Sequence, residues 1–167
     1  DRQGFDILRK AGFDVRGMGV FFERLQKAVR LYENNATAYL RTHPLTGERL
    51  TDMQNREQGV PYRQVADSID FQLVRAKVRA MDGTPGDAVK DLDKLLRERK
   101  FASEPAIRFG LAFALYRNRD WNGAEREIET IRRLKVSAPM LEHLRADIRL
   151  AQGDAAAGLT VYRDAMV

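Results

Sequence analysis

Apolar residues recur at intervals of three and four positions along most of the chain, which is the spacing of one face of an α-helix. Residues 5–11 carry one such stripe, and a longer one follows that is expected to be buried. Its members are Met18, Phe21, Phe22, Leu25, Val29 and Tyr32. No run of alternating β-branched residues indicates a strand. The pattern therefore predicts an all-α protein.

Glycine and proline mark the ends of the predicted helices in the first part of the chain. Gly12 stands where a helix commonly ends in the left-handed conformation, and Asp14 follows as a candidate cap for the next helix. Pro44 suits the first turn of a third helix, predicted at about 45–57. A Gly-Val-Pro sequence at 59–61 then interrupts the helical pattern, and everything after it has a different rhythm.

From Ser68 onward the sequence repeats itself, because pairs of small residues twelve positions apart recur at offsets of 36 and then 34 residues. The pairs are Ala76 with Ala88, Ala112 with Ala124, and Ala146 with Gly158. Each pair is followed four positions later by a bulky residue, namely Leu92, Ile128 and Tyr162. Helices that cross closely need small side chains at the contact, and the period is that of a tetratricopeptide repeat. We expect about three repeats stacked as an α-solenoid rather than an irregular bundle.

Composition narrows the function classes. The 167 residues are 44% hydrophobic and 32% charged, which is enough to bury a core, and the absence of cysteine excludes disulfides and thiolate metal sites. The net charge of +5 is spread along the chain, so we expect no nucleic-acid partner. No apolar stretch approaches the roughly 20 residues that span a bilayer, so no membrane span is expected in this segment. The absence of an initiator Met favours a chain that begins inside a longer polypeptide.

The residues alone offer little catalytic machinery. The chain has two histidines, His43 and His143, and contains no HExxH motif, phosphate-binding loop or GxGxxG motif. Two histidines without supporting spacing predict neither a complete zinc site nor a Ser-His-Asp arrangement. By chemistry alone the first 60 residues are a helical platform, and His43 beside Pro44 is a turn residue.

A series of short motifs runs through residues 1–57. The series is Asp1-Arg2-Gln3-Gly4-Phe5-Asp6-Ile7-Leu8, Ala11-Gly12-Phe13-Asp14, Gly17-Met18 with Phe21-Phe22-Glu23-Arg24-Leu25, and Leu40-Arg41-Thr42-His43-Pro44-Leu45-Thr46 with Glu48-Arg49. It resembles the stretch that follows the zinc site in M48-family metallopeptidases, especially the bacterial periplasmic, outer-membrane-assembly type with C-terminal tetratricopeptide repeats. The resemblance implies a periplasmic protein with a peptidase-derived segment at 1–60 and a repeat domain at 61–167. The remaining alternative is a stand-alone tetratricopeptide adaptor with no enzymatic role.

The resemblance also implies roles for particular residues. In the family, zinc is held by HExxH and by the Glu of an ExxAD motif, and Asp1 is similar to that motif's Asp, which supports a ligating histidine. HExxH and the Glu are absent here, so the parent protein is expected to be the zinc enzyme and this chain alone to be inactive and to bind no zinc. His43, Pro44 and Arg49 match the family's HPxxxxR, whose histidine is implied to be a removable fourth zinc ligand that keeps the enzyme latent.

Other readings of these residues stay open on the sequence alone. His43 is either the latch or a turn residue. Arg49 either pairs with a carboxylate near the peptidase cleft or lies on a solvated helix face. Asp1 either supports the metal site or frays as a terminal residue.

A tetratricopeptide array presents the first helix of each repeat along a concave groove that holds a peptide or a partner helix. Taking Ala76, Ala112 and Ala146 as contact positions predicts the groove residues Leu73, Lys77, Phe109, Phe113, Arg117, His143 and Asp147. We expect a protein or peptide partner here. Phe109 and Phe113 are either an apolar anchor for it or ordinary helix packing, and His143 is given no metal role.

Overall fold

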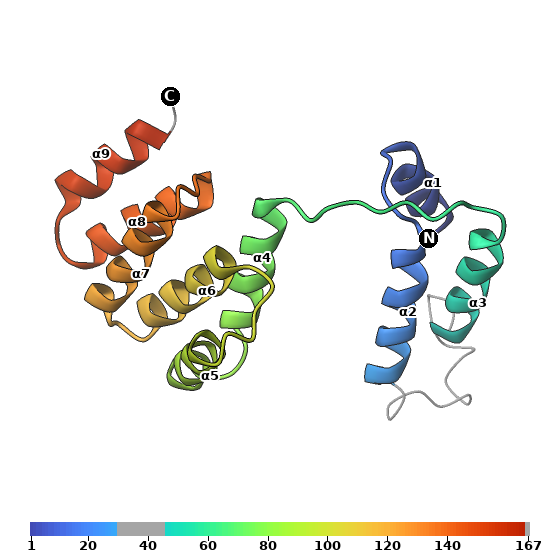
Figure 1. Ribbon diagram of the computed structural model, residues 1–167, viewed down its shortest axis with the longest axis horizontal. Helices are drawn as coiled ribbons and strands as arrows, with labels where there is room; N and C mark the ends of the chain where they lie inside the picture. The colour runs from blue at the N-terminus through green and yellow to red at the C-terminus, as the bar shows by residue number, and fades with distance from the viewer. Residues whose placement is uncertain (30–45, 166–167) are drawn as a thin grey trace, which may run out of the picture. The chain divides into compact units, whose positions relative to one another are not determined.

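The computed structural model describes residues 1–29 and 46–165, and every regular element within those ranges is an α-helix (Figure 1). In chain order the helices are α1 (Arg2–Lys10), α2 (Arg16–Val29), α3 (Thr46–Glu57), α4 (Ile69–Ala80), α5 (Pro85–Arg97), α6 (Glu104–Arg117), α7 (Trp121–Arg133), α8 (Pro139–Ala151) and α9 (Ala155–Ala165). The prediction of an all-α protein is confirmed. Among the helices of the described ranges, none combines the length and the hydropathy needed to cross a membrane.

The chain divides into two compact units, residues 1–66 and 67–167, and each unit has its own hydrophobic core. In the first unit α3 packs against α2. The core side chains are at most 4% exposed; they are Phe5, Val15, Phe22 and Met53. Gly12 follows α1 with a φ of +85°, which glycine adopts without strain, and the Asp14 side chain accepts a hydrogen bond from the Arg16 backbone N–H. Both features are as predicted.

The predicted buried stripe is wrong at Phe21, and its last member, Tyr32, lies outside the described residues. The Phe21 side chain is 58% exposed, whereas that of Phe22 is 2% exposed. Neighbouring residues on a helix point about 100° apart, so only one of two adjacent phenylalanines can face a core on one side. Phe21 instead lies edge-on to Phe22, with 5.3 Å between the ring centroids.

Three helical hairpins, α4/α5, α6/α7 and α8/α9, make up the second unit (Figure 1). The helix α6 packs against both helices of the first hairpin, and α8 packs against α7 and α6. This order of contacts is compatible with stacked tetratricopeptide repeats, and the repeat family itself stays a prediction. Side-chain caps begin five of these helices, each accepting a backbone N–H three residues on; the capping residues are Ser68, Thr84, Ser103, Asp120 and Asp154.

Small residues stand where helices approach most closely. Ala112, Ala124 and Ala146 have no exposed surface. A Cβ atom added to Gly158 would lie 3.3 Å from the backbone oxygen of Ala146 and 2.8 Å from Cγ of Leu150. The third hairpin therefore closes on Gly158, the partner that the repeat pattern gives to Ala146.

A second close approach joins successive hairpins. A Cβ atom added to Gly110 of α6 would lie 3.3 Å from the backbone oxygen of Ala76 in α4. The repeat pattern singles out Ala76 but not Gly110, because Gly110 belongs to the contact between hairpins rather than to the contact within one.

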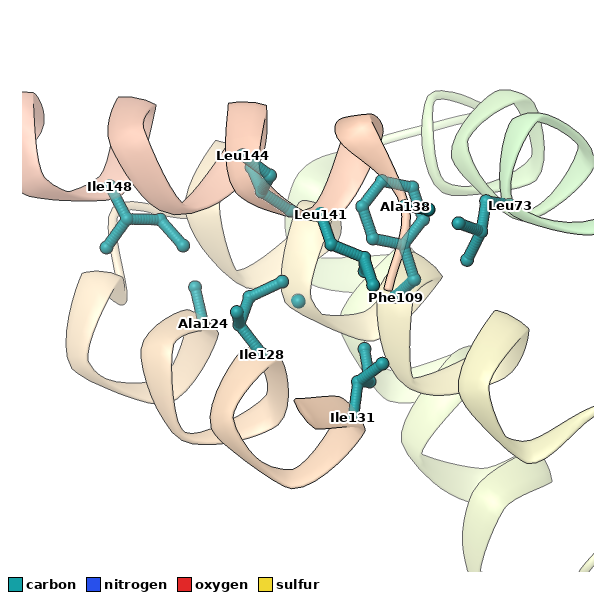
Figure 2. Packing of buried hydrophobic residues seen from close by; sticks show 10 residues of the cluster. Leu73, Phe109, Ala124, Ile128, Ile131, Ala138, Leu141, Leu144 and Ile148 are labelled. Carbon is teal, nitrogen blue, oxygen red and sulfur yellow. The ribbon is translucent and has the colours of Figure 1, made fainter. Parts of the chain in front are cut away.

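Phe109 stands in the core that links the three hairpins. Its side chain is 1% exposed and clusters with Leu73 of α4 and Leu141 of α8, and Ile128 and Ile131 of α7 belong to the same cluster (Figure 2). The second unit is thus held together by apolar contacts that cross from each hairpin to the next.

Candidate functional site

Asp1 and Arg49, the two residues that the resemblance places near a zinc site, form an ion pair in the first unit. The Arg49 Nε donates to one Asp1 carboxylate oxygen at 2.7 Å, and its Nη2 donates to the other at 2.8 Å. The Arg49 guanidinium also lies over the Phe22 ring, 4.3 Å from its centroid. Side-chain exposures of 27% and 29% leave this bidentate pair partly shielded from water.

This pair shows where the Arg49 side chain lies, and its place near a peptidase cleft stays a prediction. The side chain does not lie on a solvated helix face, because it joins the start of α1 to α3 and rests on the buried Phe22. The pair also fixes the orientation of the Asp1 carboxylate. Each carboxylate oxygen still has a lone pair available, so Asp1 is able to accept a further hydrogen bond, the role expected of a supporting residue.

The described residues do not supply a zinc site. Within 1–29 and 46–165 no group of three His, Asp or Glu side chains is arranged to hold a metal ion. His43 and Pro44 lie outside the described residues.

In the second unit, the predicted groove residues separate into buried and accessible groups. Leu73 and Phe109 belong to the core, with exposures of 0% and 1%, and no partner can touch them in this fold. Arg117 is half-buried, and its Nη1 donates to the backbone oxygen of Ala80 at 2.6 Å, which ties α6 to the end of α4. All three side chains make contacts that hold the helices of the second unit together.

Lys77 and Phe113 meet at the surface of the second unit. The Lys77 ammonium lies 5.0 Å from the centroid of the Phe113 ring, and Phe113 packs beside Tyr116 with ring centroids 6.4 Å apart. All three side chains are half-buried. They offer an apolar face with a positive charge at its edge.

His143 and Asp147 meet one hairpin further on, on α8. The His143 Nε2 lies 3.9 Å from an Asp147 oxygen, and its ring stands edge-on to that of Tyr162, 5.2 Å away. The Tyr162 hydroxyl donates to Asp147 at 2.7 Å. This hydrogen bond, together with burial and the nearby charge of Asp147 and hydroxyl of Tyr116, raises the pKa of Tyr162 to about 12.

We call these two groups of side chains together the surface row; its members are Lys77, Phe113, Tyr116, His143, Asp147 and Tyr162. Lys77, Phe113, His143 and Asp147 are four of the seven predicted groove residues. Sequence reasoning missed Tyr116 and gave Tyr162 a core role only. The tyrosine hydroxyl was the available signal, because a buried or half-buried Tyr normally finds a hydrogen-bond partner.

Replacing Tyr162 by Phe should remove the Asp147 hydrogen bond and destabilise the second unit by about 1–2 kcal/mol near neutral pH. In the folded protein the pKa of Tyr162 lies above the ordinary tyrosine value of about 10. The stabilisation from its hydrogen bond is therefore complete below about pH 10 and is lost as pH rises through about 12. The difference in free energy of unfolding between the two proteins should therefore narrow above about pH 10. Denaturant titrations at neutral and alkaline pH measure it.

Tyr62, which is 62% exposed in the first unit, provides the matched control. Tyr62→Phe should leave the pH dependence of the second unit unchanged. A constant difference between wild type and Tyr162→Phe across the alkaline range would contradict the assigned hydrogen bond.

Comparison with known proteins finds similarity to proteins named beta-barrel assembly-enhancing protease. The chain is 28% identical over 169 residues to the one from Yersinia pestis, an alignment covering 100% of this chain and 34% of that protein. It is 35% identical over 129 residues to a putative one from Vibrio cholerae, covering 75% of this chain and 26% of the relative. It is 27% identical over 156 residues to the one from Escherichia coli (strain K12), an alignment covering 93% of this chain and 32% of that protein. No protein-family model and no solved structure matches the chain.

Proposed function

The chain is related to the beta-barrel assembly-enhancing proteases of the M48 metallopeptidase family, and on that premise we propose that it is the non-catalytic C-terminal part of such an enzyme. It spans about a third or less of the length of these relatives. In this proposal residues 1–60 belong to the peptidase domain of a zinc metalloendopeptidase. Residues 61–167 form the repeat domain, which docks proteins during outer-membrane assembly in the periplasm.

The observation that carries the proposal is an alignment with a protease across 100% of the chain. A stand-alone adaptor would give no reason for the first 60 residues and the hairpins to align together with one protease. The hairpins of the second unit then supply the docking function. Their surface row combines an apolar face, a cation and an Asp-Tyr pair, which suits a polypeptide partner better than a small metabolite.

In this proposal the first unit positions the Asp1 carboxylate beside the zinc site. The bidentate pair with Arg49 holds the Asp1 carboxylate in one orientation, so that it can accept a hydrogen bond from a histidine of the upstream zinc site. Zinc, when bound by the longer protein, polarises the scissile carbonyl and lowers the pKa of a water molecule. His43 lies outside the described residues, and we assign it the role of a removable ligand that excludes this water.

In the longer protein, which carries the upstream zinc site, His43→Ala should raise the rate of casein cleavage several-fold, because water gains the coordination position that the imidazole blocks. Chelator-sensitive release of labelled fragments measures the rate. Zinc content should stay near one ion per molecule, since the principal ligands lie upstream.

The 167-residue chain is the negative control in the same assay, and it should show no chelator-sensitive cleavage. Unchanged or lower activity of His43→Ala with zinc still bound would rule out the latch. Cleavage by the isolated chain would contradict its non-catalytic assignment.

A further inference from the structure

A hollow of about 320 Å³ opens between α4, α5 and α6 of the second unit. Its apolar lining includes Leu92, Phe101 and Ile107, and its charged lining consists of Arg75, Arg79 and Lys100. No carboxylate lines it. The hollow therefore combines an apolar floor with three positive charges.

The hollow and the surface row lie on different sides of α4. Residues two apart on a helix differ in direction by about 200°, so Lys77 points away from both Arg75 and Arg79. Consistent with this, Lys77 contacts Phe113, whereas the two arginines line the hollow. The hollow is thus a separate surface.

The cations of the hollow make at most weak ion pairs with other described residues of the chain. In the described part of the chain Arg79 makes no ion pair, and Arg75 reaches Asp67 only at 3.6 Å, with both side chains at least half exposed. Lys100 pairs with Glu98, two residues away, and its side chain is 69% exposed. Exposed pairs of this kind contribute about 0–1 kcal/mol, so an incoming carboxylate can replace them at little cost.

The surroundings of the hollow restrict which anion fits. A neighbouring hollow of about 260 Å³ is lined by Asp82, Asp87 and Asp91, and Arg79 borders both. A long polyanion such as a nucleic acid would run from the basic hollow onto this acidic one and be repelled. A short segment with few negative charges would not.

From the apolar floor, the three cations and the acidic neighbour, we infer that this hollow binds a short acidic polypeptide segment carrying an apolar side chain. The apolar side chain packs beside the half-buried Phe101, and adjacent Asp or Glu residues pair with Arg75 and Arg79. The inference deepens the docking role proposed for the second unit by adding a second contact surface. It is independent of proteolysis and of the surface row.

The test uses the 167-residue chain and a short fluorescein-labelled peptide in which Asp and Glu residues flank a central Leu-Phe pair. Fluorescence anisotropy should show binding that weakens when Asn and Gln replace the peptide's carboxylates, and also when Ser replaces its Leu-Phe pair. Arg79→Glu should weaken binding roughly five- to tenfold, because it replaces an attraction by a repulsion. Circular dichroism and thermal unfolding establish that the variant folds as the wild type does.

Lys94→Glu is the matched control, since it makes the same charge change at an exposed position of α5 that does not line the hollow. It should leave peptide affinity nearly unchanged. If the two variants weakened peptide binding equally, the effect would come from general attraction between the peptide and a positively charged protein, and the proposed site would be wrong. No peptide binding, or tighter binding of a single-stranded oligonucleotide than of the peptide, would overturn it as well. None of these outcomes depends on cleavage, so failure here is distinguishable from failure of the proposed enzyme relationship.

Discussion

Replacing Phe109 by Ala is expected to lower the free energy of unfolding of the second unit by about 3–5 kcal/mol. The side chain is 1% exposed and packs in one cluster with Leu73 of α4 and Leu141 of α8, so its removal leaves a cavity where three hairpins meet. Trp121, the single tryptophan of the chain, packs against the same cluster. Denaturant titration followed by tryptophan fluorescence therefore reports on this unit.

Phe113→Ala is the matched comparison, because it removes the same ring from the same helix at a half-buried position. It should cost about 1–2 kcal/mol, since less apolar surface returns to water. Equal losses for the two variants would contradict the assignment of Phe109 to the core and of Phe113 to the surface row.

The helices of the first unit could be predicted from local signals. Gly12 and Asp14 act within a few residues of their own positions, and the structure has a positive φ at the glycine and a capping hydrogen bond at the aspartate. The Asp1–Arg49 pair had no such signal. Its members are 48 residues apart in sequence, and their meeting depends on how α1 and α3 pack.

The groove prediction was wrong for Leu73 and Phe109, whose side chains are buried. Leu73 and Phe109 each stand three positions before a contact alanine, which places them about 60° from the buried direction, where a neighbouring hairpin covers them. Lys77 and Phe113 each follow a contact alanine by one position, about 100° away, and reach the surface.

His143 has the same register as Leu73 and Phe109, yet its side chain is 62% exposed. Position relative to the contact alanine therefore does not by itself decide whether a side chain is buried, and a periodic pattern alone does not contain the missing information.

In the proposed function, the surface row brings substrates to a peptidase elsewhere in the longer protein. Lys77→Glu combined with His143→Glu should lower cleavage of an unassembled outer-membrane β-barrel protein about tenfold, because both changes alter the charge of a contact surface. In this proposal casein reaches the peptidase without docking on the row, so its cleavage should stay unchanged. Lys94→Glu combined with Ala156→Glu makes the same net charge change at exposed positions outside the row and serves as control.

The decisive measurement, made in the longer protein, is the cleavage rate of the β-barrel protein divided by the cleavage rate of casein. A fall of about tenfold in the ratio for the row variant, with none for the control, is the predicted result. An unchanged ratio in a folded row variant, or an equal fall in both variants, would contradict the account.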